Sequence, residues 1–187
     1  MKKSKIKENA EICLKDKRLL RMFFRYDVNY RYYIPLIVSG KLFLGIEEDD
    51  FLLDGYAIRR FKDVTKAEIK DDMCERILKA EGILDNIQTP EVDLSSWETV
   101  FQSLQKRDRN IIVQKEDLHE DEREFVIGRI EKVCKHHAYV RYFDADGIWE
   151  PEPYRIPYKE VTSVTFASRY VDTFSKYVGE LPGNFGK

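Results

Sequence analysis

The 187-residue chain is 43% hydrophobic and 35% charged, with a formal net charge of −2, which excludes a disordered chain and allows one large domain or two small ones. No stretch approaches the roughly 18 apolar residues that a membrane helix needs, and no apolar run follows the N-terminal lysines, so we expect neither a membrane segment nor a signal peptide. The three cysteines are widely spaced, which predicts no disulfide framework and a reducing, cytoplasmic location.

The charge is distributed unevenly along the chain. Residues 1–31 carry ten Lys and Arg against four Asp and Glu, whereas the remaining residues carry 22 against 30. Such asymmetry can mark an end that binds a partner. A solvated helix face is the simpler interpretation.

Residues 1–82 read as a helix, several short strands and a second helix. Ile6, Ala10 and Cys13 recur at helical spacing, and aromatic and β-branched residues between them and Asp72 favour strands. Pro35 predicts that its strand lies at an edge or contains a bulge. The predicted elements are a helix at 4–15, strands at 18–25, 32–38, 42–46, 51–53, 56–61 and 64–69, and a helix from 71 or 72 to 82.

Four short segments interrupt the strands of this first half. Ser39-Gly40 indicates a bend within one long strand, because glycine is common at barrel corners. Residues 26–31 and the acidic run 47–50 read as turns. Asp54-Gly55 is typical of a tight hairpin.

The same order of elements returns after residues 83–93, which contain Pro90, lack periodicity and are interpreted as a linker. An acidic loop at 116–122, an Asp146-Gly147 turn and a proline-rich stretch at 149–157 connect the later elements. The predicted elements are a helix beginning near 93 or 95, strands at 111–113, 125–133, 138–143 and 161–166, and a helix at 170–178.

The two halves also align directly in sequence. Residues 63–82 match residues 160–179 without a gap, sharing a Val-Thr pair, a lysine and a terminal glycine, with apolar positions in register. A single repeat of this length indicates duplicated domains and not a solenoid. We therefore predict an α+β, mostly β chain of two helix–barrel–helix repeats, at 1–82 and 94–187.

Several segments resemble known proteins. The segments that carry the resemblance are DGYAIRRFKDVT (54–65), LKAEG (78–82), DLSSW (93–97), IGRIEKV (127–133) and IPYKEVTSVTF (156–166). With the pattern of a helix and about five bent strands, the halves resemble Sm-like small barrels, and an SH3-like barrel fits the strand count nearly as well. The chain is similar to an uncharacterised bacterial family with two such halves, which implies a fold but no established activity.

A basic and aromatic segment at residues 21–33 is the first candidate site. Guanidinium groups can neutralise phosphates and exposed rings can stack on bases, at about 1–3 kcal/mol per base. Strands also carry such alternation for structural reasons, and the acidic turn at 47–50 would repel phosphates. The contact candidates here are Arg21, Arg25, Tyr26, Tyr30 and Arg31.

A second candidate is the turn Lys135-His136-His137, which is more compatible with a nucleic acid. Cys134 and two aspartates lie nearby, but adjacent histidines on a strand point to opposite faces and do not readily share one ion. No histidine sits in a recognisable Ser-His or Cys-His arrangement. We therefore predict no metal, no cofactor and no catalysis.

The proline-rich stretch supplies the last candidates, Trp149 and Tyr154, which can form a contact surface or fold back over the barrel. Small barrels expose edge strands that can pair between subunits or capture a peptide, and proline blunts such an edge. Our leading hypothesis is a non-catalytic module for protein–protein interaction or regulation, with self-association through edge strands as one option. RNA binding through residues 21–33 is the alternative.

Overall fold

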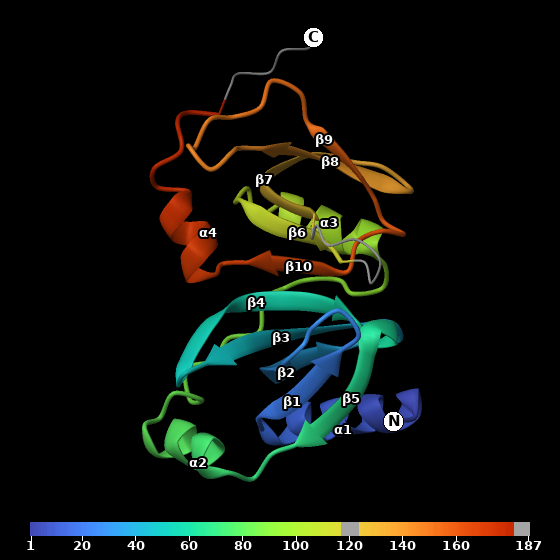
Figure 1. Ribbon diagram of the computed structural model, residues 1–187, viewed down its shortest axis with the longest axis vertical. Helices are drawn as coiled ribbons and strands as arrows, with labels where there is room; N and C mark the ends of the chain where they lie inside the picture. The colour runs from blue at the N-terminus through green and yellow to red at the C-terminus, as the bar shows by residue number, and fades with distance from the viewer. Residues whose placement is uncertain (117–123, 182–187) are drawn as a thin grey trace.

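The computed structural model describes residues 1–116 and 124–181 (Figure 1). Within these residues the fold is α+β, with four α-helices, a short 3-10 helix at Phe61–Asp63 and ten strands in one open antiparallel sheet. The helices are α1 (Lys3–Asp16), α2 (Met73–Ala80), α3 (Trp97–Gln105) and α4 (Arg169–Phe174). None of these described helices is long and apolar enough to cross a membrane.

The ten described strands divide evenly between the two halves of the chain. The first half contains β1 (Leu20–Phe24), β2 (Tyr30–Val38), β3 (Leu42–Asp49), β4 (Leu52–Arg60) and β5 (Val64–Ile69). The second half contains β6 (Ile111–Lys115), β7 (Glu124–Val133), β8 (His137–Tyr142), β9 (Tyr154–Pro157) and β10 (Ser163–Phe166). The sheet order is β5-β1-β2-β3-β4-β10-β6-β7-β8-β9, so each half follows the same order of its fifth, first, second, third and fourth strands.

The two halves join where β4 pairs with β10. Tyr56 and Phe166 face each other across this pair, and their rings stack with centroids 5.1 Å apart. Ile58 of β4 belongs to the same buried cluster as Val164 and the core of the second half. The junction is therefore continuous in hydrogen bonding and in apolar packing. Figure 1 shows β4 lying along β10.

Each half has its own helix packed on its strands. Ile6, Ala10 and Cys13 of α1 are fully buried among β1, β2 and β5, as the predicted stripe requires. Phe101 and Leu104 of α3 occupy the corresponding core of the second half. Ser96 caps α3 by accepting the Thr99 N–H, where the sequence pattern had indicated residue 93 or 95.

Several sequence predictions are confirmed at the residue level. Asp72 caps α2 by accepting the Glu75 N–H at 3.3 Å. β5 covers the predicted residues 64–69. The register of β2 against β3 shifts between Pro35 and Ile37, which is the bulge that the proline indicated.

Three predictions about the strands are wrong. Residues 39–41 reverse the chain between the antiparallel β2 and β3, so Ser39-Gly40 is not a bend in one strand. Asp54-Gly55 is not a hairpin turn, because β4 runs straight through it and the reversal lies at Asp50-Phe51, where both φ angles are positive. Part of the proline-rich stretch forms the strand β9.

The strand pairing does not close a barrel within the described residues. In the first half, β5 and β4 lie at opposite ends of the strand order and do not pair with each other. In the second half, the same holds for β10 and β9. The predicted loop at 116–122 falls mostly outside the described residues.

The two free edges of the sheet are β5 and β9, and both are protected. On β5, carbonyls of Val64, Thr65 and Ala67 accept hydrogen bonds from Lys3, the N-terminal amine and Asn9, so α1 covers that edge. On β9, the Tyr158 N–H donates to the His136 carbonyl. Antiparallel alternation then turns the backbone groups of Arg155 and Pro157 outward. Pro157 has no N–H to offer to another strand, which protects this edge.

Candidate functional site

A groove of about 900 Å³ lies at one side of the junction between the halves. It is walled by the turn between β1 and β2, the turn between β3 and β4, the start of α2 and the segment from β10 to α4. We call it the acidic groove. Its lining residues are Asp27, Val28, Asn29, Tyr30, Arg31, Tyr32, Glu47, Glu48, Asp49, Asp50, Phe51, Asp54, Cys74, Thr165 and Ser168.

The lining is strongly negative. Six carboxylates face one guanidinium, that of Arg31. Arg31 is already neutralised, since it donates to Asp27 at 3.0 Å and to Glu47 at 2.7 Å. Like charges gathered in a concave surface with low-dielectric walls reinforce one another's field. The groove therefore attracts cations and repels phosphates.

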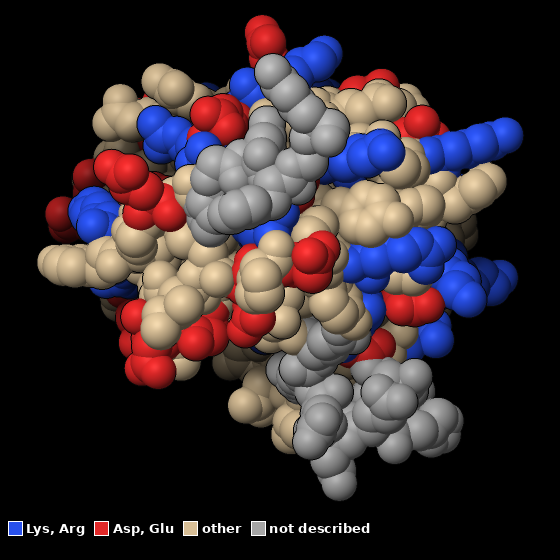
Figure 2. Space-filling model, turned by 90° about the horizontal axis from the view of Figure 1, so that it is seen from above, with Lys and Arg blue, Asp and Glu red and all other residues tan. Residues whose placement is uncertain are grey.

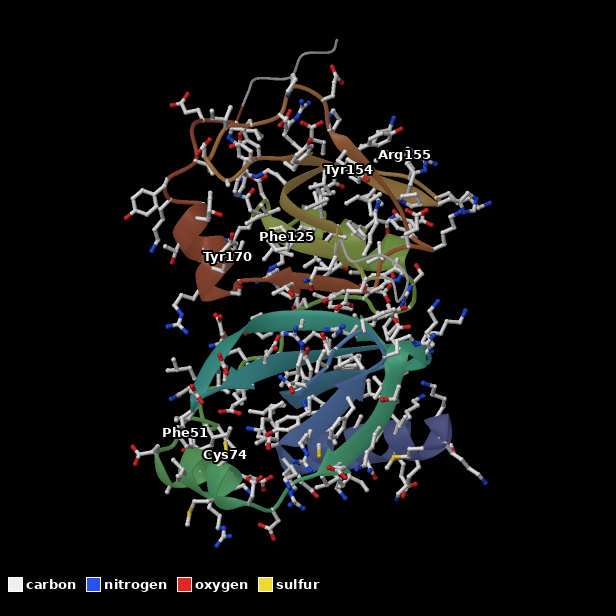
Figure 3. The ribbon with its side chains drawn as sticks, in the orientation of Figure 1. Phe51, Cys74, Phe125, Tyr154, Arg155 and Tyr170 are labelled. Carbon is white, nitrogen blue, oxygen red and sulfur yellow. The ribbon has the colours of Figure 1, made fainter. Side chains whose placement is uncertain are left out.

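The tight turn between β3 and β4 builds one wall of the groove. Asp50 and Phe51 both adopt positive φ, at 47° and 66°, which reverses the chain in two residues. The buried Glu48 carboxylate holds this turn by accepting the Phe51 N–H at 2.7 Å. As a result the Phe51 ring stands 42% exposed, on the same side of the molecule as Cys74 in Figure 3.

Apolar side chains border the acidic groove as well. Val28, in the turn between β1 and β2, is 99% exposed, and Tyr30, the first residue of β2, is 45% exposed. Leu52, at the start of β4, is also exposed. Exposed apolar side chains beside a concave surface are typical of protein interaction sites.

Cys74 at the start of α2 brings a thiol into the acidic groove. Burial, together with the neighbouring Glu48 carboxylate, raises the pKa of Cys74 to about 11. At neutral pH the thiol is therefore protonated, whereas a cysteine nucleophile needs the thiolate.

The arginines of the segment 21–33 all have acidic partners. Arg21 pairs with Glu68 and lies 4.9 Å from the centroid of the Tyr30 ring. Arg25 lies 3.6 Å from Asp63, a carboxylate to which Tyr26 donates at 3.2 Å. Arg31 is paired in the acidic groove, so the three arginines of this segment lie in three separate ion pairs with different carboxylates.

The second predicted cluster lies far from the groove, at the turn between β7 and β8. Lys132, Tyr139 and Arg155 occupy matching positions on β7, β8 and β9, a set that we call the basic row. His137 stands next to Tyr139 on the same face, and partial burial and Arg155 lower its pKa. Lys135 and His136 are exposed at the adjoining turn.

Figure 2 shows how charge is distributed over the face of the molecule that is seen from above. Seen from above, acidic side chains gather toward the side where α2 and α4 lie in Figure 1. Basic side chains gather toward the opposite side, which holds the turn between β7 and β8.

Trp149 and Tyr154 pack within the second half. The Trp149 indole donates to the Gly179 carbonyl at 2.8 Å and meets Phe143 edge to face. The Tyr154 ring meets Tyr142 in the same manner, and Lys115 donates to its hydroxyl. The two residues therefore do not form one contact surface.

The described residues contain no group of three or more His, Cys, Asp or Glu side chains arranged to hold a metal ion. Comparisons of the chain with protein-family models, with curated proteins and with solved structures found no match.

Sequence reasoning identified the acidic run 47–50 only as an obstacle to RNA. It missed Cys74, Thr165 and Ser168, which come from elements far apart in the chain. The sequence held two local signals for this site: many carboxylates in residues 47–54 and many aromatic residues in residues 30–33.

Proposed function

We propose that this protein is a non-catalytic binding module whose acidic groove accepts a cationic segment of a partner protein. The observation that carries the proposal is the groove's composition: six carboxylates, one guanidinium that is already paired, and an exposed apolar border. Electrostatic complementarity of this kind steers association and selects the partner.

We also propose that each half is an Sm-like unit and that the two arose by duplication. The support is the strand order, which repeats in both halves, together with one helix that precedes the strands of each half. In this proposal the shared fold is the scaffold. The groove forms from turns and helix ends that differ between the halves.

A binding role is favoured over catalysis by the state of the groove's thiol. Cys74 has a pKa of about 11, and no histidine lines the groove to deprotonate it. A protonated thiol without a base does not initiate acyl or group transfer.

RNA binding is the second candidate function. Its proposed site is the basic row and not the segment 21–33. Lys132 and Arg155 flank the Tyr139 ring on the exposed side of the sheet, a combination that suits phosphates and a stacked base. This candidate predicts binding of oligouridylate that weakens steeply with salt and is lost in K132Q/R155Q.

The test of the leading proposal uses a fluorescently labelled oligolysine peptide and fluorescence anisotropy at low salt. We expect binding to the wild-type chain, weaker binding as salt increases, and at least a fivefold loss of affinity in D49N/D50N. Asn tolerates the positive φ at residue 50, so this variant keeps the turn.

A matched control removes two exposed carboxylates away from the groove, in E81Q/E91Q. This variant should bind oligolysine like the wild type. Equal losses in both variants would mean that net charge alone governs binding, and the proposed site would be wrong.

A further inference from the structure

A second groove, of about 550 Å³, adjoins the acidic groove and has the opposite character. It lies between the start of β4 and one face of α4, and we call it the aromatic groove. Its lining residues are Asp54, Arg169, Tyr170, Thr173, Phe174 and Tyr177. The Tyr170 ring is 52% exposed and the Tyr177 ring is 82% exposed.

The aromatic groove is part of a larger exposed apolar surface. Phe125 of β7 is 44% exposed and meets Tyr170 edge to face, with ring centroids 6.1 Å apart. Figure 3 shows these two side chains on neighbouring elements, β7 and α4. Phe174 connects them to the core by stacking on Phe143. Tyr170, whose ring also packs on Phe174, thus stands on side chains that are anchored in the core, which lowers the entropy lost when a ligand covers it.

The two grooves meet at one contact between the halves. Asp54 lines both, and its carboxylate accepts the Arg169 N–H at 2.5 Å. Ser168, the preceding residue, lines the acidic groove. β4 approaches α4 so closely here that a Cβ at Gly55 would lie 2.6 Å from the Ser168 Cα. The contact fixes the position of one groove relative to the other.

We propose that the two grooves together bind one segment of a partner protein in which a cationic block adjoins an apolar block. This inference rests on the proposed function of the acidic groove and extends it. The aromatic groove presents its rings on one side of Asp54, whereas the carboxylates of the acidic groove lie on the other side, inside an apolar border. Lysines interspersed along the whole segment would therefore place some of their charges against the aromatic rings. The order of the two blocks matters as well as their composition.

The charges on the chain favour a different protein as the occupant. Anionic lipids and nucleic acids would be repelled by the acidic groove. The basic N-terminal helix of a second copy is a poor ligand, because Lys5 pairs with Glu8, Lys7 pairs with Glu11, and Lys3 binds carbonyls next to β5.

The test compares two labelled peptides of equal length, oligolysine and a block peptide in which lysines are followed by leucines and a tryptophan. We expect the block peptide to bind the wild-type chain about tenfold or more tightly than oligolysine, since each tenfold step corresponds to about 1.4 kcal/mol. In Y170S/Y177S this advantage should disappear while the affinity for oligolysine stays unchanged. I148S, which removes a 64% exposed apolar side chain elsewhere, is the matched control and should keep the advantage.

The outcomes separate the two proposals. If the block peptide binds no more tightly than oligolysine, or keeps its advantage in Y170S/Y177S, the inference fails and the acidic groove remains the site. If oligolysine itself does not bind, both proposals fail. If sedimentation shows a dimer that Y170S/Y177S converts to a monomer, the occupant is a second copy and the inference is overturned.

Discussion

The Arg59 guanidinium of β4 donates to the Glu116 carboxylate at 2.7 Å, and the two side chains, 2% and 1% exposed, link the first half of the chain to the second. Arg59 also lies over the Phe24 ring, 3.9 Å from its centroid. Its Nε atom and Oε1 of Glu116 have no hydrogen-bond partner among the described atoms. Glu116 is the nearer of two buried carboxylates beside Arg59, because Asp27 lies 4.0 Å from the guanidinium.

Replacing one member of this pair should lower the free energy of unfolding by more than half of what replacing both members costs. We expect E116L alone to lower the free energy of unfolding by about 3 kcal/mol, because it leaves the buried guanidinium with only the more distant Asp27 as a described acidic partner. R59M should cost a similar amount. The double variant R59M/E116L should cost clearly less than the sum of the two. Urea denaturation measures all three, and strict additivity would contradict the coupling.

The close approach of β4 to α4 should make Gly55 hard to replace. Its φ of +71° opposes a side chain, and a Cβ at this position would lie only 2.6 Å from the Ser168 Cα. We expect G55A to lose more than about 1 kcal/mol of stability, since alanine is strained at positive φ. G40A is the control, because a Cβ there has nothing within 4 Å. Equal melting temperatures for the two variants would contradict this prediction.

The raised pKa of Cys74 should be visible in its alkylation. With a pKa of about 11, the thiolate fraction at pH 8 is on the order of 0.1%, and the rate of labelling by iodoacetamide should rise about tenfold per pH unit up to pH 10. E48Q removes one cause of the raised pKa and should accelerate labelling at pH 8. Peptide mass spectrometry gives the rate, with the half-buried Cys134 as the internal control. A rate at Cys74 that is flat above pH 8 would refute this prediction.

The prolines of the proline-rich stretch should keep the β9 edge from pairing. Pro157 and Arg155 turn their backbone groups outward, and the same alternation places Pro153 outward just before the strand. Prolines on both sides leave the Arg155 N–H as the only donor among these three positions. We expect P153T/P157T to self-associate at concentrations where the wild type does not, as measured by sedimentation velocity. An unchanged sedimentation coefficient would show that another feature protects the edge.

Local signals in the sequence predicted the local features of the structure. The α1 stripe, the Asp72 cap, the Pro35 bulge and the extent of β5 follow from spacing and side-chain chemistry within a few residues. The Asp54-Gly55 pair led to a wrong prediction because its glycine is required by a contact with a distant segment and not by a local turn. A hairpin turn and a close approach by Ser168 both require glycine, and the sequence alone does not distinguish them.

The candidate site was harder to predict because it is assembled from distant segments. Arg21, Arg25 and Arg31 are conspicuous in the sequence, but their partners Glu68, Asp63 and Glu47 lie on other elements. Pairing reverses the apparent character of the segment. The acidic run at 47–50 becomes a groove wall only when β10 and α4 are brought opposite it, which depends on the pairing of β4 with β10.

The pairing of β4 with β10 also affects how the chain folds during its synthesis. β4 pairs with a strand that is made about a hundred residues later, which at ~5–20 residues per second takes roughly 5–20 s on the ribosome. During that interval the first half can form its other strands, yet one side of β4 has no partner. An unpaired strand edge is a template for aggregation. Nascent or truncated chains that lack β10 are thus the forms of this protein most in need of a chaperone.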